Sequence, residues 1–306
     1  MKKKILLTGS NGLLGQKLVE LITSKGEYEL VAVARGENRL PDIYGKYEYI
    51  SLDITNREEV LKTVVSVNPD YIIHGAAMTN VDQCEVERDA CWELNVRATE
   101  SFVEAARLTN AHLVHLSTDF IFDGTAGPYD EEAEANPISF YGVSKVAAER
   151  MVLKSAAIIK YSIVRTVLVY GIAHDMSRLN IVLWVKGTLE QGKTLNIVND
   201  QFRTPTLAED LAMGCYLVVK NDATGIYNIS GEDFMTPYDM AIATADYFNL
   251  DKSLINVVSS ATLNQTAKRP PRTGFIIDKA KNNLGYKPHS FKEGIDILKQ
   301  QTEKVL

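Results

Sequence analysis

The sequence predicts an α/β protein with a doubly wound parallel sheet and a smaller α/β lobe beside it. Up to about residue 170, short apolar runs alternate with segments of helical periodicity, which is typical of parallel strands joined by right-handed crossovers. The first apolar run passes directly into a glycine-rich turn. Beyond residue 170 the alternation is lost. We therefore expect a sheet domain at 1–170 and mainly the second lobe at 171–306, from which some chain returns to the sheet.

Six apolar runs in the first half are expected to form strands, at 3–8, 30–34, 47–52, 71–74, 111–116 and 162–170. Helices are expected between them, the longest at 89–109. Thr55 and Thr206 each stand three residues before a glutamate, a pattern that predicts a capping box. Thr236 precedes a proline and predicts a capped helix over 237–248. Further elements are expected at 178–191, 194–198, 207–220, 226–229 and 291–305.

The composition is that of an acidic globular protein, with a net charge of -6 and a pI of about 5.5. No basic run follows the lysines at 2–4, which argues against nucleic acid or an anionic membrane as a partner. The apolar run from Ile5 to Leu7 is too short for an export signal, and no run approaches the roughly 20 residues that cross a bilayer. We therefore expect a cytoplasmic protein that acts on a small molecule; assembly as a homodimer stays open.

The cysteine and histidine patterns indicate neither a disulfide framework nor a metal site. The three cysteines form no CxxC pair, and their number is odd. The five histidines are scattered, and His112 and His115 lie three apart in an expected strand, so they point to opposite faces. We expect no metal at the active site.

A nucleotide phosphate site is predicted where the first strand meets Gly9-Ser-Asn-Gly12-Leu-Leu-Gly15 and a helix follows. Glycines let the backbone approach a pyrophosphate, and the free N–H groups of a helix N-terminus point at it. Such turns also occur without a ligand, but here both flanks fit. Arg35 follows the second strand, where an arginine suits the 2′-phosphate of NADP. We expect NADPH to be preferred, with NAD open; a solvated Arg35 is the alternative, and Arg39 competes for the role.

Tyr141 and Lys145 lie four residues apart, on one face of an expected helix. A lysine beside a tyrosine stabilises the phenolate, which predicts a lowered pKa for Tyr141 and a group that exchanges a proton with a carbonyl. The same spacing recurs at Tyr216 and Lys220, where the apolar residues in between predict a core helix ending in a solvated lysine. A solvated face is the alternative for the first pair.

The carboxyl ends of the expected strands are where a doubly wound sheet binds its ligands. Thr118 follows the fifth strand and can hydrogen-bond a substrate carbonyl that Tyr141 also reaches; a local turn contact is the alternative. Arg203 and Arg269 stand on proline-containing loops of the second half, where arginines suit a diphosphate. Surface salt bridging is the alternative for both.

Three motifs together resemble the extended short-chain dehydrogenase/reductases: Thr8-Gly9-x-x-Gly12-x-x-Gly15, Ser117-Thr118-Asp119 and Tyr141-x-x-x-Lys145. Three further stretches are similar to the dTDP-4-dehydrorhamnose reductases: Gly75-Ala-Ala-Met-Thr79-Asn-Val81-Asp82, Ser117-Thr-Asp-Phe-Ile-Phe-Asp-Gly124 and Asp200-Gln201 with Pro205-Thr206. The resemblance covers the whole chain. It implies a Rossmann fold, an NAD(P) cofactor and a role in dTDP-rhamnose biosynthesis for cell-surface polysaccharides.

The resemblance implies an oxidoreductase that transfers hydride from NADPH to the 4-keto group of a nucleotide-activated 6-deoxy sugar, most directly dTDP-4-dehydrorhamnose. Tyr141 would protonate the keto oxygen, Lys145 would bind the nicotinamide ribose and Thr118 would orient the carbonyl. The cofactor would be held by Gly9, Asn11, Gly12, Leu13, Leu14, Gly15, Arg35, Asp53, Ile54, Ala76, Ala77, Tyr141 and Lys145. The substrate would be held by Val81, Asp119, Phe120, Arg203 and Arg269.

Three positions depart from related enzymes and bear on the substrate. Sugar-nucleotide dehydratases of this superfamily have Thr-Asp-Glu at the end of the fifth strand, whereas Phe120 stands here in place of the glutamate, so reduction is favoured over loss of water. Better-known rhamnose-pathway reductases have a tyrosine at Phe120, a tryptophan at Leu168 and a small residue at Arg203. The β subunit of methionine adenosyltransferase is similar too. A dinucleotide-binding regulatory subunit is therefore an alternative, as is a reductase or epimerase of another nucleotide sugar.

Overall fold

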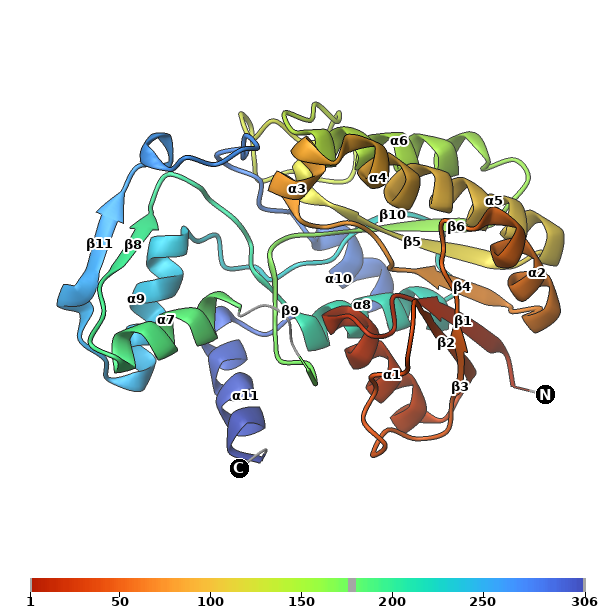
Figure 1. Cartoon of the computed structure of the whole chain (residues 1–306), viewed down its shortest axis with the longest axis horizontal. Helices are drawn as coiled ribbons and strands as arrows, with labels where there is room; N and C mark the ends of the chain where they lie inside the picture. The colour runs from red at the N-terminus through yellow and green to blue at the C-terminus, as the bar shows by residue number, and fades with distance from the viewer. Residues whose placement is uncertain (1, 176–179, 305–306) are drawn as a thin grey trace.

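The computed structural model describes residues 2–175 and 180–304. Its centre is a seven-stranded parallel sheet with the strand order β10-β6-β5-β4-β1-β2-β3 (Figure 1). The order runs in one direction from β1 to β3 and in the other from β4 to β6, which confirms the predicted doubly wound sheet. The strands are β1 (Lys4–Thr8), β2 (Glu29–Ala34), β3 (Glu48–Ser51), β4 (Tyr71–His74), β5 (His112–Thr118), β6 (Tyr161–Thr166) and β10 (Gly225–Asn228).

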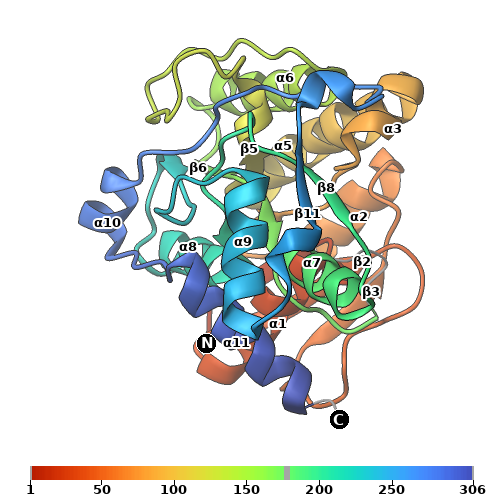
Figure 2. The same ribbon diagram turned by 90° about the vertical axis from the view of Figure 1, so that its left-hand side faces the viewer.

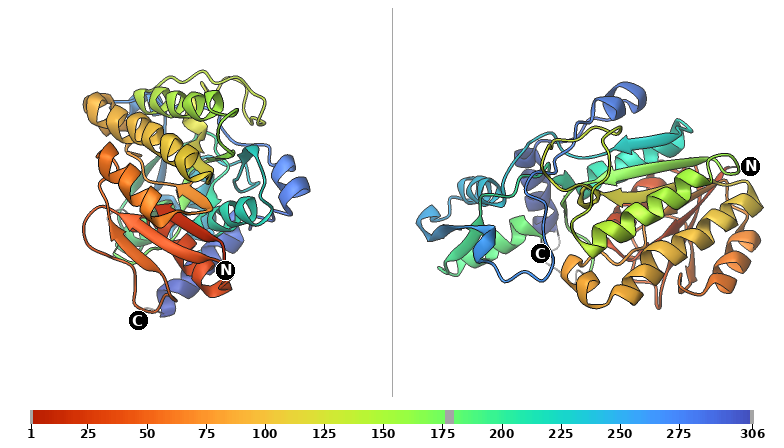
Figure 3. Two further views of the ribbon diagram at one scale, coloured as in Figure 1. Left: turned by 90° about the vertical axis from the view of Figure 1, so that its right-hand side faces the viewer. Right: turned by 90° about the horizontal axis from the view of Figure 1, so that it is seen from above.

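Helices cover both faces of the sheet, because successive residues of each buried strand point to opposite sides. In β1, Ile5 and Leu7 pack toward α1, α8 and α10, whereas Leu6 packs toward α2, α5 and α6. Seen from above, α5 and α6 lie side by side across the sheet (Figure 3, right). The bounds are α1 (Leu13–Lys25), α2 (Arg57–Val67), α5 (Ala98–Thr109), α6 (Phe140–Lys154), α8 (Ala208–Lys220) and α10 (Asp278–Leu284).

The second lobe lies beyond one end of the sheet and has its own apolar clusters (Figures 1 and 2). A two-stranded parallel sheet, β11-β8, packs against α7 and α9. Helix α9 begins with the predicted cap at Thr236, which forms a capping box with Asp239. No helix of the described residues is long and apolar enough to cross a membrane. The lobe contains β7 (Val169–Tyr170), α7 (Ile181–Glu190), β8 (Leu195–Val198), β9 (Thr206–Leu207), α9 (Pro237–Phe248), β11 (Ile255–Val258) and α11 (Phe291–Lys304).

The expected capping boxes at Thr55 and Thr206 are both wrong. Helix α2 is capped by Asn56, whose side chain accepts a backbone N–H of the first turn. Thr55 instead donates its hydroxyl to the Asp53 carboxylate. Thr206 lies in β9 and donates its hydroxyl to the Val167 carbonyl oxygen, so α8 begins without a side-chain cap. In each case the residue after the threonine occupies the cap position, so the threonine lies one residue too early to cap the helix.

Two expected elements are divided in the structure. The helix expected at 89–109 consists of α4 (Arg88–Trp92), a π-helical turn (Glu93–Arg97) and α5, and a short helix not predicted, α3 (Val81–Val86), precedes it. The strand expected at 162–170 is β6 and β7, separated at Leu168, whose φ is 34°. Residues 178, 179 and 305 of two expected helices lie outside the described residues.

Candidate active site

A cavity of about 840 Å³ lies at the carboxyl ends of the sheet strands. Its walls come from the turn after β1, the loop after β2, the ends of β4 and β5, and α6. Two predicted site residues, Arg203 and Arg269, are not part of its lining. The predicted site residues that line it are Gly9, Asn11, Gly12, Leu13, Leu14, Gly15, Arg35, Asp53, Ile54, Ala76, Ala77, Val81, Thr118, Asp119, Phe120, Tyr141 and Lys145.

The turn after β1 is shaped to bring a phosphate group close to the backbone. Gly9 has a φ of 76°, in the left-handed region that favours glycine. A Cβ on Gly15 would lie 2.1 Å from the Gly9 carbonyl oxygen, so α1 approaches the turn this closely only with glycine there. Helix α1 begins after Gly12 with no acidic residue in its first turn, and its free N–H groups favour an anion. These features fit the pyrophosphate of a dinucleotide.

The loop after β2 carries two arginines to the rim of the cavity. Arg35 and Arg39 are both exposed, and both line the cavity. Asn11 holds this loop in place: its amide donates to the Glu37 carbonyl oxygen at 2.9 Å, and its Oδ1 accepts the Arg39 N–H at 3.1 Å. Either guanidinium therefore fits the 2′-phosphate of NADP.

Tyr141 and Lys145 are buried on α6, with 8% and 3% of their surfaces exposed, and both line the cavity. The Lys145 ammonium donates to the Leu116 carbonyl oxygen at 2.6 Å and lies 3.3 Å from His115 Nε2. Burial lowers the pKa of Lys145 to about 8, and the charge of Glu149 acts against this shift. Helix α6 thus holds a phenol and an ammonium on one wall of the cavity.

The expectation that Lys145 lowers the pKa of Tyr141 is wrong in this structure. Burial raises the pKa of Tyr141 above its usual range, because a buried phenolate loses its hydration. A hydrogen bond with Thr118 acts in the opposite direction, but less strongly. The ammonium of Lys145 is instead held against β5. A phenol that keeps its proton at neutral pH suits a proton donor.

Thr118 ends β5 beside Tyr141, and its hydroxyl is fixed by its two neighbours in the chain. It donates to Asp119 Oδ1 at 3.1 Å and accepts the Phe120 N–H at 3.3 Å. The Phe120 ring meets the Tyr141 ring edge-on, with centroids 5.8 Å apart. One wall of the cavity therefore presents two hydroxyl groups, from Thr118 and Tyr141, to a bound molecule.

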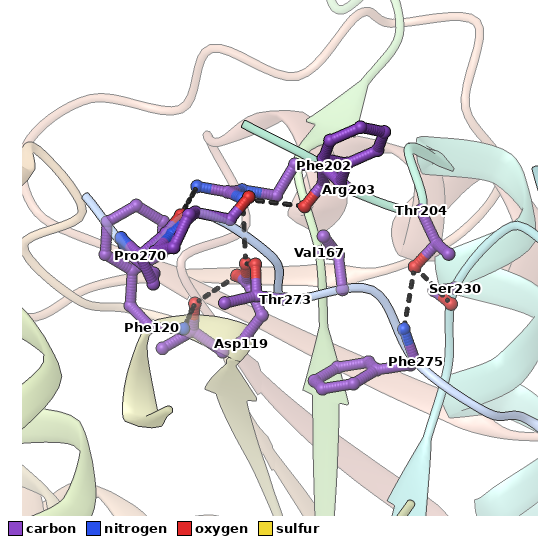
Figure 4. A network of polar contacts seen from close by, with 12 residues as sticks. Asp119, Phe120, Val167, Phe202, Arg203, Thr204, Ser230, Pro270, Thr273 and Phe275 are labelled. Atoms are coloured by element: carbon purple, nitrogen blue, oxygen red, sulfur yellow. Dashed lines mark hydrogen bonds and ion pairs between the residues drawn. The ribbon is translucent and has the colours of Figure 1, made fainter. Parts of the chain in front are cut away.

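Arg203 and Arg269, predicted as substrate ligands, both pair with carboxylates of the sheet domain. Arg203 is 5% exposed, and its Nε lies 3.6 Å from Asp119 Oδ2 (Figure 4). Arg269 donates to both carboxylate oxygens of Asp82, at 2.9 and 2.6 Å, which lowers the pKa of Asp82 to about 2. Both arginines thus join loops of the second lobe to the sheet domain. A direct contact of either with a substrate stays a prediction.

Two histidines belong to the site, although sequence reasoning considered histidines only as metal ligands. His74 lines the cavity and lies 2.9 Å from Thr8 Oγ1, and His115 lies beside Lys145. Burial and the charge of Lys145 lower the pKa of both imidazoles, that of His74 to about 3, so both are neutral. His74 could have been identified because it is the last residue of β4, whereas His115 lies in the middle of β5 and gives no such signal. Among the residues described, no group of three or more His, Cys, Asp or Glu is placed to hold a metal ion.

Comparisons with known proteins agree with this geometry. The model of one family, described as the RmlD substrate binding domain, matches residues 2–303. A dTDP-4-dehydrorhamnose reductase of Aggregatibacter actinomycetemcomitans is 30% identical over 312 residues, covering 98% of this chain and 99% of the relative. The methionine adenosyltransferase 2 subunit beta of Xenopus tropicalis is 29% identical over 272 residues, covering 87% of this chain and 78% of the relative.

A solved structure extends the likeness to three dimensions. The dTDP-4-dehydrorhamnose reductase of Bacillus anthracis, solved in complex with NADP, superposes with a TM-score of 0.85 and 29% identity, covering 98% of this chain and 100% of that one. The family match over nearly the whole chain confirms the resemblance that the motifs indicate. The chain belongs to the RmlD substrate binding domain family, and in sequence and fold it is similar to dTDP-4-dehydrorhamnose reductases.

Proposed function

We propose that this chain uses NADPH to reduce the 4-keto group of a nucleotide-activated 6-deoxy sugar, with dTDP-4-dehydrorhamnose, reduced to dTDP-rhamnose, as the first candidate. As a member of this family the chain is an NAD(P)-dependent oxidoreductase. The observation that carries the proposal is the cavity itself. Thr118, Tyr141 and Lys145 line the same space as the glycine-rich turn, so a proton donor and a dinucleotide site meet there.

The residues of the cavity fit a dinucleotide cofactor, which supplies a hydride when bound. The backbone from Gly9 to Leu13 would hold the pyrophosphate, residues 53–54 the adenine, and residues 76–77 the ribose and the nicotinamide side. Arg35 or Arg39, at the rim, would pair with the 2′-phosphate. This charge pairing supports a preference for NADPH, with NAD as the weaker ligand.

Tyr141 would give its proton to the keto oxygen as the sugar is reduced. Burial keeps that proton on the phenol until negative charge develops on the oxygen in front of it. The Thr118 hydroxyl would hold the same oxygen. Lys145, with a pKa of about 8, is mostly protonated at neutral pH and would donate to the nicotinamide ribose.

The segment after Thr118 supports reduction over dehydration. Loss of water from a sugar needs an acid and a base on adjacent carbons. Here Asp119 is 2% exposed and engaged by neighbouring side chains, and the next residue, Phe120, offers a ring that packs on Tyr141. This segment therefore presents no free carboxylate beside the phenol.

The proposal is tested by following NADPH oxidation with a panel of nucleotide 4-keto-6-deoxy sugars that includes dTDP-4-dehydrorhamnose. We expect turnover, and we expect Tyr141→Phe to lower kcat by about 10²-fold or more while NADPH affinity stays nearly unchanged. Tyr216→Phe is the matched control, because Tyr216 has the same spacing to a lysine but is buried in α8, away from the cavity. No turnover on any sugar of the panel would contradict the proposal, and an active Tyr141→Phe would contradict its proton donor.

A regulatory subunit is the second candidate function. The likeness to methionine adenosyltransferase 2 subunit beta favours it, as does Leu168, which lines the cavity, is 41% exposed and lacks the aromatic ring of better-known reductases. NADPH binding without turnover on the panel, together with recovery of a stoichiometric adenosyltransferase from a pull-down, would replace the first proposal.

A further inference from the structure

We propose that Asp119 and Arg203 form a positioning pair through which the second lobe fixes the Thr118 hydroxyl at the cavity. The inference rests on the proposed function, because it takes Thr118 as the residue that holds the keto oxygen of the substrate. It gives both residues a role other than the substrate contact that the sequence predicts, since neither has to touch the sugar.

Asp119 is a buried carboxylate whose partners come from both lobes (Figure 4). Its Oδ1 accepts the Thr118 hydroxyl at 3.1 Å. Its Oδ2 accepts the hydroxyl of Thr273 and lies 3.6 Å from Arg203 Nε. One carboxylate oxygen is therefore tied to the end of β5, and the other is tied to two loops of the second lobe.

Arg203 is held in place by the segments of the second lobe around it. Its guanidinium donates to the carbonyl oxygens of Pro270 and Phe202, each at 2.7 Å. Its backbone exchanges two hydrogen bonds with Met235, each at 2.8 Å. Swinging the side chain into the cavity would take away the Arg203 hydrogen bond of the buried Pro270 carbonyl group and the countercharge of Asp119, which is costly. The arginine is thus a fixed charge.

A second line of contact leads from Arg203 to Tyr141. The guanidinium carbon lies 5.8 Å from the centre of the Phe120 ring. That ring in turn meets the Tyr141 ring edge-on at 5.8 Å. Arg203 therefore supports the Thr118 hydroxyl through Asp119 and the Tyr141 phenol through Phe120. The Thr118 hydroxyl and the Tyr141 phenol, the two groups proposed to contact the keto oxygen, are therefore both supported by Arg203.

The pair matters because Thr118 has a single hydroxyl proton, which an isolated carboxylate would hold strongly. Arg203 and Thr273 share the negative charge of Asp119, which weakens Oδ1 as an acceptor and lets the proton turn toward a keto oxygen. The Phe120 N–H, 3.3 Å from Thr118 Oγ1, keeps the hydroxyl oxygen in place meanwhile. Misplacing a reacting group by about 1 Å costs about 10²-fold in rate, so the effect is measurable.

The test is a double-mutant cycle in kcat for the sugar that the enzyme turns over. Asp119→Asn and Arg203→Met are each made in the wild-type protein and in Thr118→Val. Arg165→Met is the matched control, because Arg165 is equally buried and pairs with Glu149 instead. We expect Asp119→Asn and Arg203→Met to lower kcat about tenfold or more in the wild-type background, but less than about threefold in Thr118→Val. NADPH affinity should stay within about twofold, and any effect of Arg165→Met should be equal in both backgrounds.

Equal losses of kcat in the two backgrounds would overturn the proposal, because the pair would then not act through Thr118. If Arg203→Met fails to fold, Asp119→Asn, whose side chain has nearly the same shape as that of Asp119, is sufficient for the double-mutant cycle.

A second experiment does not depend on turnover. It measures the ¹³Cζ resonance of Tyr141, which is assigned by its absence from the spectrum of Tyr141→Phe. It should move in Asp119→Asn as it does in Thr118→Val, and not in Tyr216→Phe, because Tyr216 lies on α8 away from the cavity. An unmoved resonance in Asp119→Asn would also overturn the proposal. If no sugar reacts, the proposed function is contradicted. The Tyr141 resonance still tests whether Asp119 and Arg203 position the Thr118 hydroxyl.

Discussion

Two buried arginine–carboxylate pairs lie behind the cavity wall that carries Thr118 and Tyr141, and they differ in geometry and in the elements they join. Within the sheet domain, Arg165 on β6 donates two hydrogen bonds to the carboxylate of Glu149 on α6, at 3.0 and 2.8 Å. Arg203 approaches Asp119 with a single contact of 3.6 Å between the two lobes, and the carboxylate is shared with two threonine hydroxyls. The first pair anchors the helix of Tyr141; the second leaves its carboxylate available to other partners.

The difference in geometry suggests that the two arginine–carboxylate pairs have different roles. A two-pronged pair with complementary geometry is suited to hold a helix on a strand, and breaking it leaves an unpaired buried charge. A looser contact, in which hydroxyl groups supply part of the stabilisation, is suited to orient those hydroxyls. We therefore expect the Arg165 pair to matter most for stability and the Arg203 pair to matter most for turnover.

The largest effect on stability is expected from Glu149→Gln. It removes the partner of a buried guanidinium and should lower the free energy of unfolding by about 3–5 kcal/mol, measured by urea denaturation. The double variant Glu149→Leu with Arg165→Met should recover most of this loss, because apolar residues often replace a buried ion pair without cost. A loss below about 1 kcal/mol in Glu149→Gln would mean that the pair acts like a surface salt bridge.

A smaller effect, with a distinct pH dependence, is expected from Asp119→Asn. Burial raises the pKa of Asp119 above its ordinary value of 3.8, so its contribution to stability is present at low pH and lost as the pH rises. The stability of the wild type relative to Asp119→Asn should therefore fall as the pH rises from about 4. Urea denaturation of both proteins across this range measures the difference. A slope of opposite sign would show that Arg203 outweighs burial and that the pair also contributes to stability.

The smallest effect is expected from Arg269→Ala, which breaks the partly exposed pair between Arg269 and Asp82. The side chains of Arg269 and Asp82 are 18% and 39% exposed, so solvent screens them and the loss should stay below about 1 kcal/mol. Because the pKa of Asp82 is lowered to about 2, this contribution is present above pH 3.8 and is lost as the pH falls through about 2. Denaturation curves of the two proteins should converge in acid and in high salt; a gap as large as that of Glu149→Gln would contradict the ranking.

Most strands of the sheet domain could be predicted from the sequence because they are short apolar runs that two layers of helices bury; the edge strand β3 is only partly buried. The second lobe could be predicted only as separate pieces. Its strands β8 and β11 are far apart in the chain, and both leave residues exposed, so neither shows the pattern of a buried strand. The pairing of β10 with β6 likewise depends on packing between distant segments.

The position of Thr118, Tyr141 and Lys145 at the cavity could be predicted because each motif lies on an element with a fixed place in a doubly wound sheet. Arg203 could not be placed in the same way. Its loop contains a proline and a cation, but the carboxylate it meets, Asp119, lies in another domain and much earlier in the chain. The direction of the Tyr141 pKa was missed for a related reason, since burial depends on the whole fold and outweighs any effect of the nearby lysine.

The position of β10 in the sheet limits which segments of this chain can be exchanged with those of a relative. The chain leaves the sheet after β6, returns as α8 and β10, leaves again for α9 and β11, and returns once more as α10. A gene fragment that stops near residue 170 would lack the outer strand of the sheet and the helix that packs on α1, and the bare edge of β6 would invite aggregation. A chimera with a new specificity lobe must therefore keep both the segment from α8 to β10 and helix α10 with the sheet.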